Sequence, residues 1–99
     1  MTVKVIRFVS GENVVCDLEE ETDDSVVIRD AIVAIPANQE GTQLAFAPFA
    51  PLQDSSETTL KIDKQFVMYI CKLSPGLEEQ YNKMFNRPDI ITPKKQLIL

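Results

Sequence analysis

Two stretches decide the fold of this chain: Val3-Lys4-Val5-Ile6-Arg7-Phe8-Val9 at residues 3–9 and Phe66-Val67-Met68-Tyr69-Ile70-Cys71-Lys72-Leu73 at residues 66–73. Both are rich in β-branched and aromatic residues, which strands favour. Three further strand-like apolar stretches lie between them, at residues 13–18, 25–35 and 44–52, the last of them rich in Ala. The sequence therefore predicts a small, mainly β module with antiparallel strands.

The connections between these strands carry turn and loop residues. Ser10-Gly11-Glu12-Asn13 supplies a hairpin turn, and the third strand stops at Pro36, which has no N–H to donate. The apolar segment 44–52 contains two prolines, which favours an edge or bulged strand that could face a neighbouring subunit. The last strand, residues 59–73, is predicted to be long and to bend near residues 63–65, as strands do when a small barrel closes.

A single helix is predicted after the last strand. Ser74 is a suitable N-cap, Pro75 fits the first turn, and the helix is expected to end before Arg87-Pro88. Its apolar stripe consists of Leu77, Tyr81, Met84 and Phe85. Packing of this stripe on the chain's own sheet is favoured over docking on a partner.

The predicted organisation has three parts. They are a β domain at residues 1–73, a helix at residues 74–87 and a tail at residues 88–99. The tail is apolar at both ends, and we expect it to add a strand to this subunit or to another one.

Length and composition indicate one domain. A chain of 99 residues buries a real but modest core. No apolar run approaches the roughly 18 residues that span a bilayer, and the first residues enter a strand pattern instead of a secretory signal. These features predict a cytoplasmic protein without a membrane partner.

Charge is unevenly distributed along the chain. The net charge is −5, and residues 1–73 hold six Lys and Arg against twelve Asp and Glu. Such a balance repels nucleic-acid phosphate at long range, because binding without sequence preference depends on Lys and Arg. RNA binding would therefore have to be local and pocket-like.

The cysteines predict no redox or metal chemistry. Cys16 and Cys71 lie in apolar strand-like stretches, without CxxC spacing and without a His partner. Free thiols buried in the core are therefore favoured over a disulfide or a metal pair.

The residues that build common catalytic sites are missing. The chain has no His, and none of its three Gly has the spacing of a phosphate-binding loop. We therefore expect no enzyme, no catalytic residue and no cofactor. The acidic run at residues 19–24 lacks the order of a calcium loop, so a solvated loop is favoured over a Ca²⁺ or Mg²⁺ site and no metal ligand is predicted.

The pattern of residues 3–35 followed by residues 60–73 resembles the two-part signature of the Sm and Sm-like family. The first part is similar at Gly11, Leu18, the loop Glu21 to Asp24, Val26-Val27-Ile28 and Asp30-Ala31. The second part is similar at Ile62, Val67, Tyr69 and Ile70. Within the family, the chain looks most like the small divergent Sm-like proteins of marine bacteriophages.

The chain also departs from the family pattern. Ser25 stands where the family usually has a base-contacting Asn, and Asp63-Lys64 replaces the Arg-Gly that helps to form the uridine pocket. The family's N-terminal helix is missing, and a helix and a tail follow the last strand instead.

The resemblance implies a strongly bent, five-stranded antiparallel barrel that assembles with further copies of itself into a ring. The subunit interface implied by this arrangement includes Leu44, Phe46, Phe49, Val67 and Tyr69. Loops around the central pore would bind RNA or another ligand through Asp23, Asp24, Ser25, Asp63, Lys64 and Gln65. Lys64 would contact phosphate, whereas the others suit a base edge or a basic protein.

Two functions fit this reading. The first is a ring-forming, non-enzymatic module of RNA metabolism that binds single-stranded RNA or an RNA-handling protein. The alternative is a phage scaffold or adaptor that binds other proteins without RNA, which the net charge and the replaced Arg-Gly favour.

Overall fold

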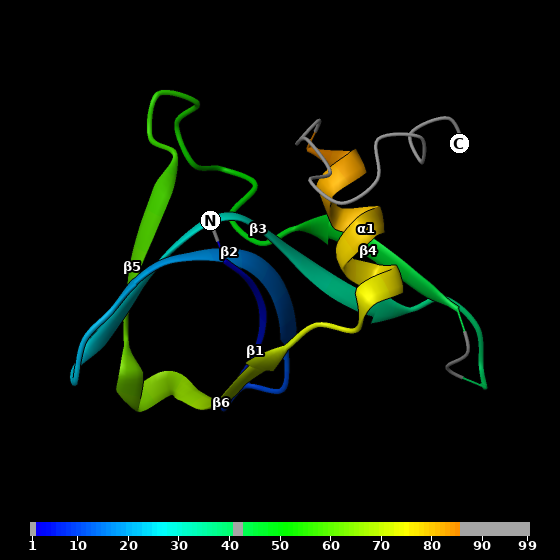
Figure 1. Ribbon diagram of the computed structural model, residues 1–99, viewed down its shortest axis with the longest axis horizontal. Helices are drawn as coiled ribbons and strands as arrows, with labels where there is room; N and C mark the ends of the chain where they lie inside the picture. Colours follow the sequence, from blue (N-terminus) through cyan, green and yellow to red (C-terminus); the bar gives the residue numbers. More distant parts are fainter. Residues whose placement is uncertain (1, 41–42, 86–99) are drawn as a thin grey trace.

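The computed structural model describes residues 2–40 and 43–85 (Figure 1). Its elements are β1 (Val3–Phe8), β2 (Asn13–Glu21), β3 (Ser25–Pro36), β4 (Leu44–Pro48), β5 (Thr59–Asp63), the 3₁₀ turn η1 (Lys64–Phe66), β6 (Val67–Lys72) and α1 (Pro75–Met84). The protein is thus mainly β with one helix after the last strand, as the sequence predicts. The predicted tail at residues 88–99 lies outside the described residues.

The strands form one antiparallel sheet in the order β4-β3-β2-β1-β6. β3 is the longest strand and pairs along one edge with β2. Its other edge is shared, because β5 pairs with residues 25–29 and β4 pairs with residues 32–36. The hydrogen-bonded sheet is not closed, although it curls so that β5 and β6 meet at η1 (Figure 1).

The predicted last strand is two strands. The bend expected near residues 63–65 is present as η1, which separates β5 from β6 and raises the strand number from five to six. Asp63 caps this turn, because its Oδ1 accepts a hydrogen bond from the backbone N–H of Gln65 at 3.0 Å. The strand predicted at residues 44–52 ends earlier, at Pro48.

β3 bends where its pairing changes from β5 to β4. At the bend, Asp30 has a φ of 54°, in the left-handed region that non-glycine residues seldom adopt. The hydroxyl of Tyr81 donates a hydrogen bond to the carbonyl oxygen of Asp30 at 2.7 Å and lies 3.4 Å from that of Arg29. The helix therefore satisfies backbone groups that the bend removes from the sheet ladder.

One face of the sheet, the inner face, encloses the first core. Its buried residues are Ile6, Phe8, Val14, Cys16, Val26 and Ile28. Phe49, which follows β4, closes one end of this core by stacking on Phe8 with ring centroids 5.5 Å apart. Strands alone supply most of this core, because the curled sheet faces itself.

The opposite, outer face carries α1. Tyr81 is 2% exposed and packs with Val3, Val15, Ile32 and Leu73. Leu77 and Phe85 pack against the same cluster, so the prediction that the stripe covers the chain's own sheet is confirmed for them. Met84 is instead largely exposed, at the last position of the helix. Ser74 and Pro75 occupy the N-cap and first helical positions, as predicted.

The two cysteines differ, and the prediction that both are buried is wrong for Cys71. Cys16 is fully buried in the inner core, whereas Cys71 is exposed. Cys71 pairs with Val5 on β6, a strand at the end of the sheet order, where fewer neighbours cover a side chain. Both thiols are free.

Within residues 2–40 and 43–85, α1 is too short to cross a bilayer, and no helix meets the length and apolarity that such a span needs.

Candidate functional site

The turn between β2 and β3 is held by hydrogen bonds to Thr22. Its hydroxyl oxygen accepts from the backbone N–H of Ser25 at 3.1 Å and of Asp24 at 3.3 Å, and its own N–H donates to the carbonyl oxygen of Ser25 at 2.9 Å. Thr and Ser side chains commonly stabilise turns in this way. Three predicted site residues, Asp23, Asp24 and Ser25, therefore sit on a defined turn.

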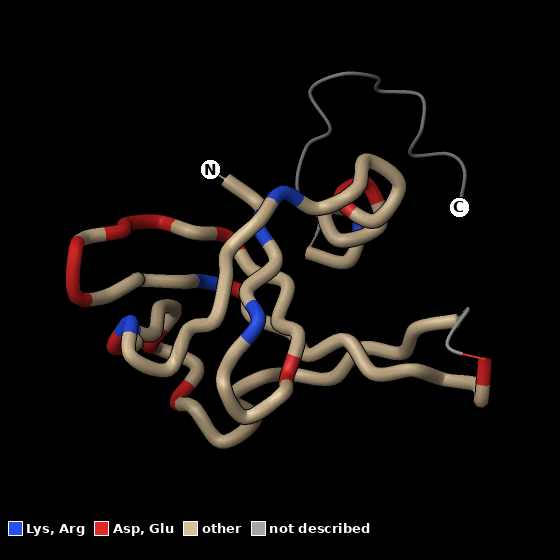
Figure 2. Tube along the Cα trace, turned by 90° about the horizontal axis from the view of Figure 1, so that it is seen from below, with Lys and Arg blue, Asp and Glu red and all other residues tan. Residues whose placement is uncertain are grey.

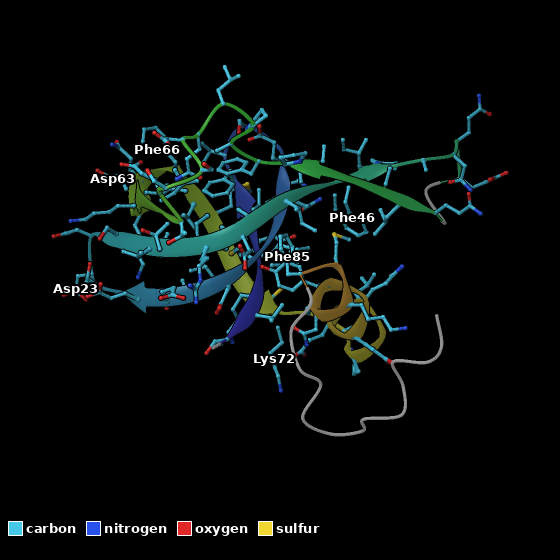
Figure 3. The ribbon with its side chains drawn as sticks, turned by 90° about the horizontal axis from the view of Figure 1, so that it is seen from above. Asp23, Phe46, Asp63, Phe66, Lys72 and Phe85 are labelled. Carbon is cyan, nitrogen blue, oxygen red and sulfur yellow. The ribbon has the colours of Figure 1, made fainter. Side chains whose placement is uncertain are left out.

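The second predicted segment, residues 63–65, lies directly beside this turn. The backbone N–H of Lys64 donates to the carbonyl oxygen of Asp24 at 2.8 Å, and Asp63 pairs with Ser25 in the ladder of β5 and β3. Figure 3 shows Asp23 and Asp63 at the same end of the molecule. The structure thus brings together all six residues predicted to bind a ligand, although they come from segments about forty positions apart in the sequence.

Electrostatics at this end are dominated by carboxylates. Residues 19–24 contain five, and Asp63 adds a sixth (Figure 2). The ammonium of Lys64, predicted to contact phosphate, lies 2.8 Å from a carboxylate oxygen of Glu21. A second pair joins Arg29 to Glu19 at 3.1 Å. Lys64 and Arg29 are therefore both engaged by carboxylates, and Glu21 joins the candidate site although it is not among the predicted residues.

Four of the five residues predicted at a subunit interface fall on the two outermost strands, and Phe49 follows β4. Leu44 and Phe46 belong to β4, and Val67 and Tyr69 belong to β6, at opposite ends of the sheet order. Leu44 and Tyr69 are 42% and 49% exposed. Phe49 and Val67 instead pack against the chain's own inner core.

An apolar hollow of about 340 Å³ lies between η1, β5 and the end of β1. It is lined by Phe8, Val9, Phe49, Leu60, Ile62 and Phe66, among others. Phe66 is half exposed at its rim, next to Asp63 (Figure 3). Sequence reasoning missed this hollow, because its lining comes from four separate segments that only the curled sheet brings together.

Two buried ionisable groups on β2 serve the fold. Burial, together with the neighbouring carboxylate of Asp17, raises the pKa of the Cys16 thiol to about 12. Asp17 is fully buried, and its Oδ1 accepts a hydrogen bond from the backbone N–H of Thr2 at 2.8 Å. A thiol held in its protonated form is a poor nucleophile, so this pair offers no covalent chemistry.

The described part of the chain is residues 2–40 and 43–85. No three His, Cys, Asp or Glu side chains there converge so as to hold an ion, even though the turn is rich in carboxylates.

No protein-family model matches this chain, and a search of curated proteins finds no significant match. The resemblance to the Sm-like family therefore depends on the residues quoted above.

Proposed function

We propose that this protein is a non-enzymatic Sm-like module that assembles with copies of itself into a ring in the cytoplasm and acts in RNA metabolism. The observation that carries this proposal is the pair of open edges at the two ends of the sheet. Among the described residues, β4 and β6 each pair with a neighbouring strand on one side only. Strand edges with free backbone groups are natural sites for pairing with another chain.

Exposed apolar side chains at both edges support assembly. Leu44 on β4, and Met68 and Tyr69 on β6, are each at least 42% exposed. Because the two edges differ, their pairing is head to tail, and head-to-tail contacts form a ring when the rotation between copies closes.

The connection between β5 and β6 supports a barrel in each subunit. β5 pairs with β3 and β6 pairs with β1, so the three residues of η1 join opposite sides of the curled sheet. The N–H of Val9 also donates to the carbonyl oxygen of Phe66 at 2.8 Å, which ties the end of β1 to η1. A small Sm-like barrel would be completed in this manner.

The proposed ligand is single-stranded RNA, bound at the turn formed by residues 22–25 and at η1. Ser25 and Gln65 offer hydrogen-bonding groups for a base edge, and Lys64 offers a cation for phosphate. The Lys64 ammonium would have to exchange Glu21 for the phosphate, a rearrangement that half-exposed side chains permit.

A second candidate is supported by the carboxylates at the same end. A ring that presents Asp23, Asp24 and Asp63 on every subunit suits a basic protein segment better than a polyanion. In this case the protein is a scaffold or adaptor that binds proteins without RNA.

Light scattering of the full chain, followed by titration with a short oligouridine at low salt, tests the proposal. We expect a discrete oligomer that binds, with Lys64→Ala weakening the binding and reducing its salt slope by roughly one phosphate contact. Lys61→Ala is the matched control, because Lys61 is exposed on β5 before the turn.

The other outcomes are equally informative. A monomer at all concentrations contradicts the ring. A ring that does not bind oligouridine but binds a Lys-rich and Arg-rich peptide favours the adaptor. In that case Asp23→Asn should lower the affinity of the ring for the peptide.

A further inference from the structure

A hollow of about 370 Å³ lies between the open edge of the sheet and the helix. It is lined by Ala37, Gln43, Leu44, Phe46, Leu77 and Gln80. Phe46 and Leu77 form its apolar floor and pack on the outer core, on the side of the sheet that carries α1 (Figure 3). The side-chain amides of Gln43 and Gln80 provide polar groups at its rim. A much smaller cavity, of about 150 Å³, already accepts a benzene ring.

The hollow borders the edge of β4 that has no strand partner among residues 2–40 and 43–85. On β4, residues 44, 46 and 48 pair with residues 36, 34 and 32 of β3. Ile32 belongs to the outer core, so Leu44 and Phe46 lie on the outer face as well. A strand added to this edge would place its own outer-face side chains over the hollow.

The other end of the sheet carries a side chain of matching character. On β6, Tyr69 pairs with Arg7 and Cys71 pairs with Val5. Val5 packs on the outer core, which places Tyr69 on the outer face too, since alternate residues share a face. Tyr69 is 49% exposed, with an apolar ring and a polar tip, as the hollow requires.

We propose that Tyr69 of a second copy of this chain enters the hollow between β4 and α1. The proposal rests on the head-to-tail assembly described above and names the contact that gives it specificity. β4 and β6 run in the same direction at opposite ends of the sheet, so parallel pairing of β6 of one copy with β4 of the next joins outer face to outer face and brings this ring beside Phe46 and Leu77. The phenol then meets the amides of Gln43 and Gln80.

Charge around the two surfaces is complementary. Lys4 and Lys72 face each other in the ladder of β1 and β6, and Arg7 lies opposite Tyr69. The elements that border the hollow carry an excess of negative charge, with Glu40 in the loop before β4 and Glu78, Glu79 and Lys83 on the helix. Opposite charges favour approach of β6 to this side of a second copy and disfavour pairing of two β6 edges.

The helix therefore has a second role beyond covering the outer core. Tyr81 anchors α1 through the hydrogen bond to Asp30, and this fixes the wall formed by Leu77 and Gln80. A hollow with a rigid wall selects one side chain and one register, because it does not need to be ordered on binding.

The test compares variants of the full chain by light scattering and by native mass spectrometry. Tyr69→Ala should weaken assembly by about tenfold in the dissociation constant, as loss of a central aromatic side chain does. Tyr69→Phe should weaken it less. Leu52→Ala, at an exposed apolar position in the loop between β4 and β5, should leave it unchanged.

A direct contact is measured by replacing Gln80 with p-benzoylphenylalanine and mixing labelled with unlabelled copies. After irradiation we expect crosslinked peptides that join the helix of one copy to residues 67–72 of another. Circular dichroism confirms that each variant is folded.

The outcomes separate this inference from the proposed function. If the wild type assembles but Tyr69→Ala assembles equally well, or if crosslinks form outside β6 of the second copy, the Tyr69 contact is wrong and the ring proposal stands. If the wild type is a monomer, both are overturned.

Discussion

The inner and outer faces of this one sheet bury their apolar side chains in different ways. The inner core is made mostly by strands, because the sheet curls until its own face is enclosed. The outer core exists only because α1 covers it, and its anchor is Tyr81, an aromatic residue with a hydroxyl. The comparison teaches that curvature replaces a second layer on one side, whereas the other side needs a helix.

β2 contributes to both cores at once. Val14 and Cys16 point into the inner core, and Val15 points into the outer core. Four consecutive residues, 14–17, are buried as a result. A strand covered on both faces loses the alternation of apolar and polar residues that marks a half-exposed strand.

The largest expected effect compares one deletion in each core. Ile28→Ala in the inner core should lower the free energy of unfolding by about 3 kcal/mol, because Ile28 is fully buried and leaves a cavity. Leu77→Ala in the helix should cost only about 1 kcal/mol, because its site is partly open. Urea denaturation followed by circular dichroism measures both values. Equal losses would show that the two cores are equally enclosed.

The second prediction uses pH to probe the inner core. The Cys16 thiol keeps its proton in the folded state up to a pKa of about 12, whereas in the unfolded chain it ionises near its ordinary value of 9.0. Between these values the folded state binds more protons, so stability falls as pH rises, by about 1.4 kcal/mol per pH unit. Below that window the thiol adds no pH dependence.

Unfolding of the wild type and of Cys16→Ala at pH 8.0 and about 10.5 tests this expectation. The wild type should lose about 2 kcal/mol more than the variant over this interval. The exposed Cys71 is present in both proteins, so its contribution to the pH dependence cancels in the comparison. Equal losses of unfolding free energy in the two proteins would mean that the Cys16 thiol is exposed to solvent in the folded state.

The third prediction concerns the polar anchor of the outer core. Tyr81→Phe removes the hydrogen bond to the carbonyl oxygen of Asp30 and should cost about 1 kcal/mol. No loss in Tyr81→Phe would indicate that water replaces the hydroxyl at the bend of β3.

The smallest effect is expected outside both cores, at the ion pair of Lys64 and Glu21. Lys64→Ala and Glu21→Gln should each change the free energy of unfolding by less than about 0.5 kcal/mol, because both side chains are partly exposed to solvent. The measurement is the urea midpoint at low and at high salt. A loss as large as that of Tyr81→Phe would show that this ion pair stabilises the fold as much as the hydrogen bond of Tyr81 does.

Much of the candidate site was accessible from sequence. The acidic turn and the bend near residues 63–65 are local features, marked by charge and by breaks in the apolar pattern, and the structure places them side by side. The ion pair between Lys64 and Glu21 was not accessible, because it depends on how β2 and η1 approach each other in space. The apolar hollow beside Phe66 was missed for the same reason.

The sequence by itself determined the mainly β class, the first three strands, the turn at Gly11 and the helix that begins at Pro75, because these depend on neighbours along the chain. Only the tertiary structure decided that Cys16 is buried and Cys71 exposed, that Asp30 adopts a left-handed conformation, and that β3 shares one edge between two strands. Each of these depends on which distant segments meet, and local propensity carries no information about that meeting.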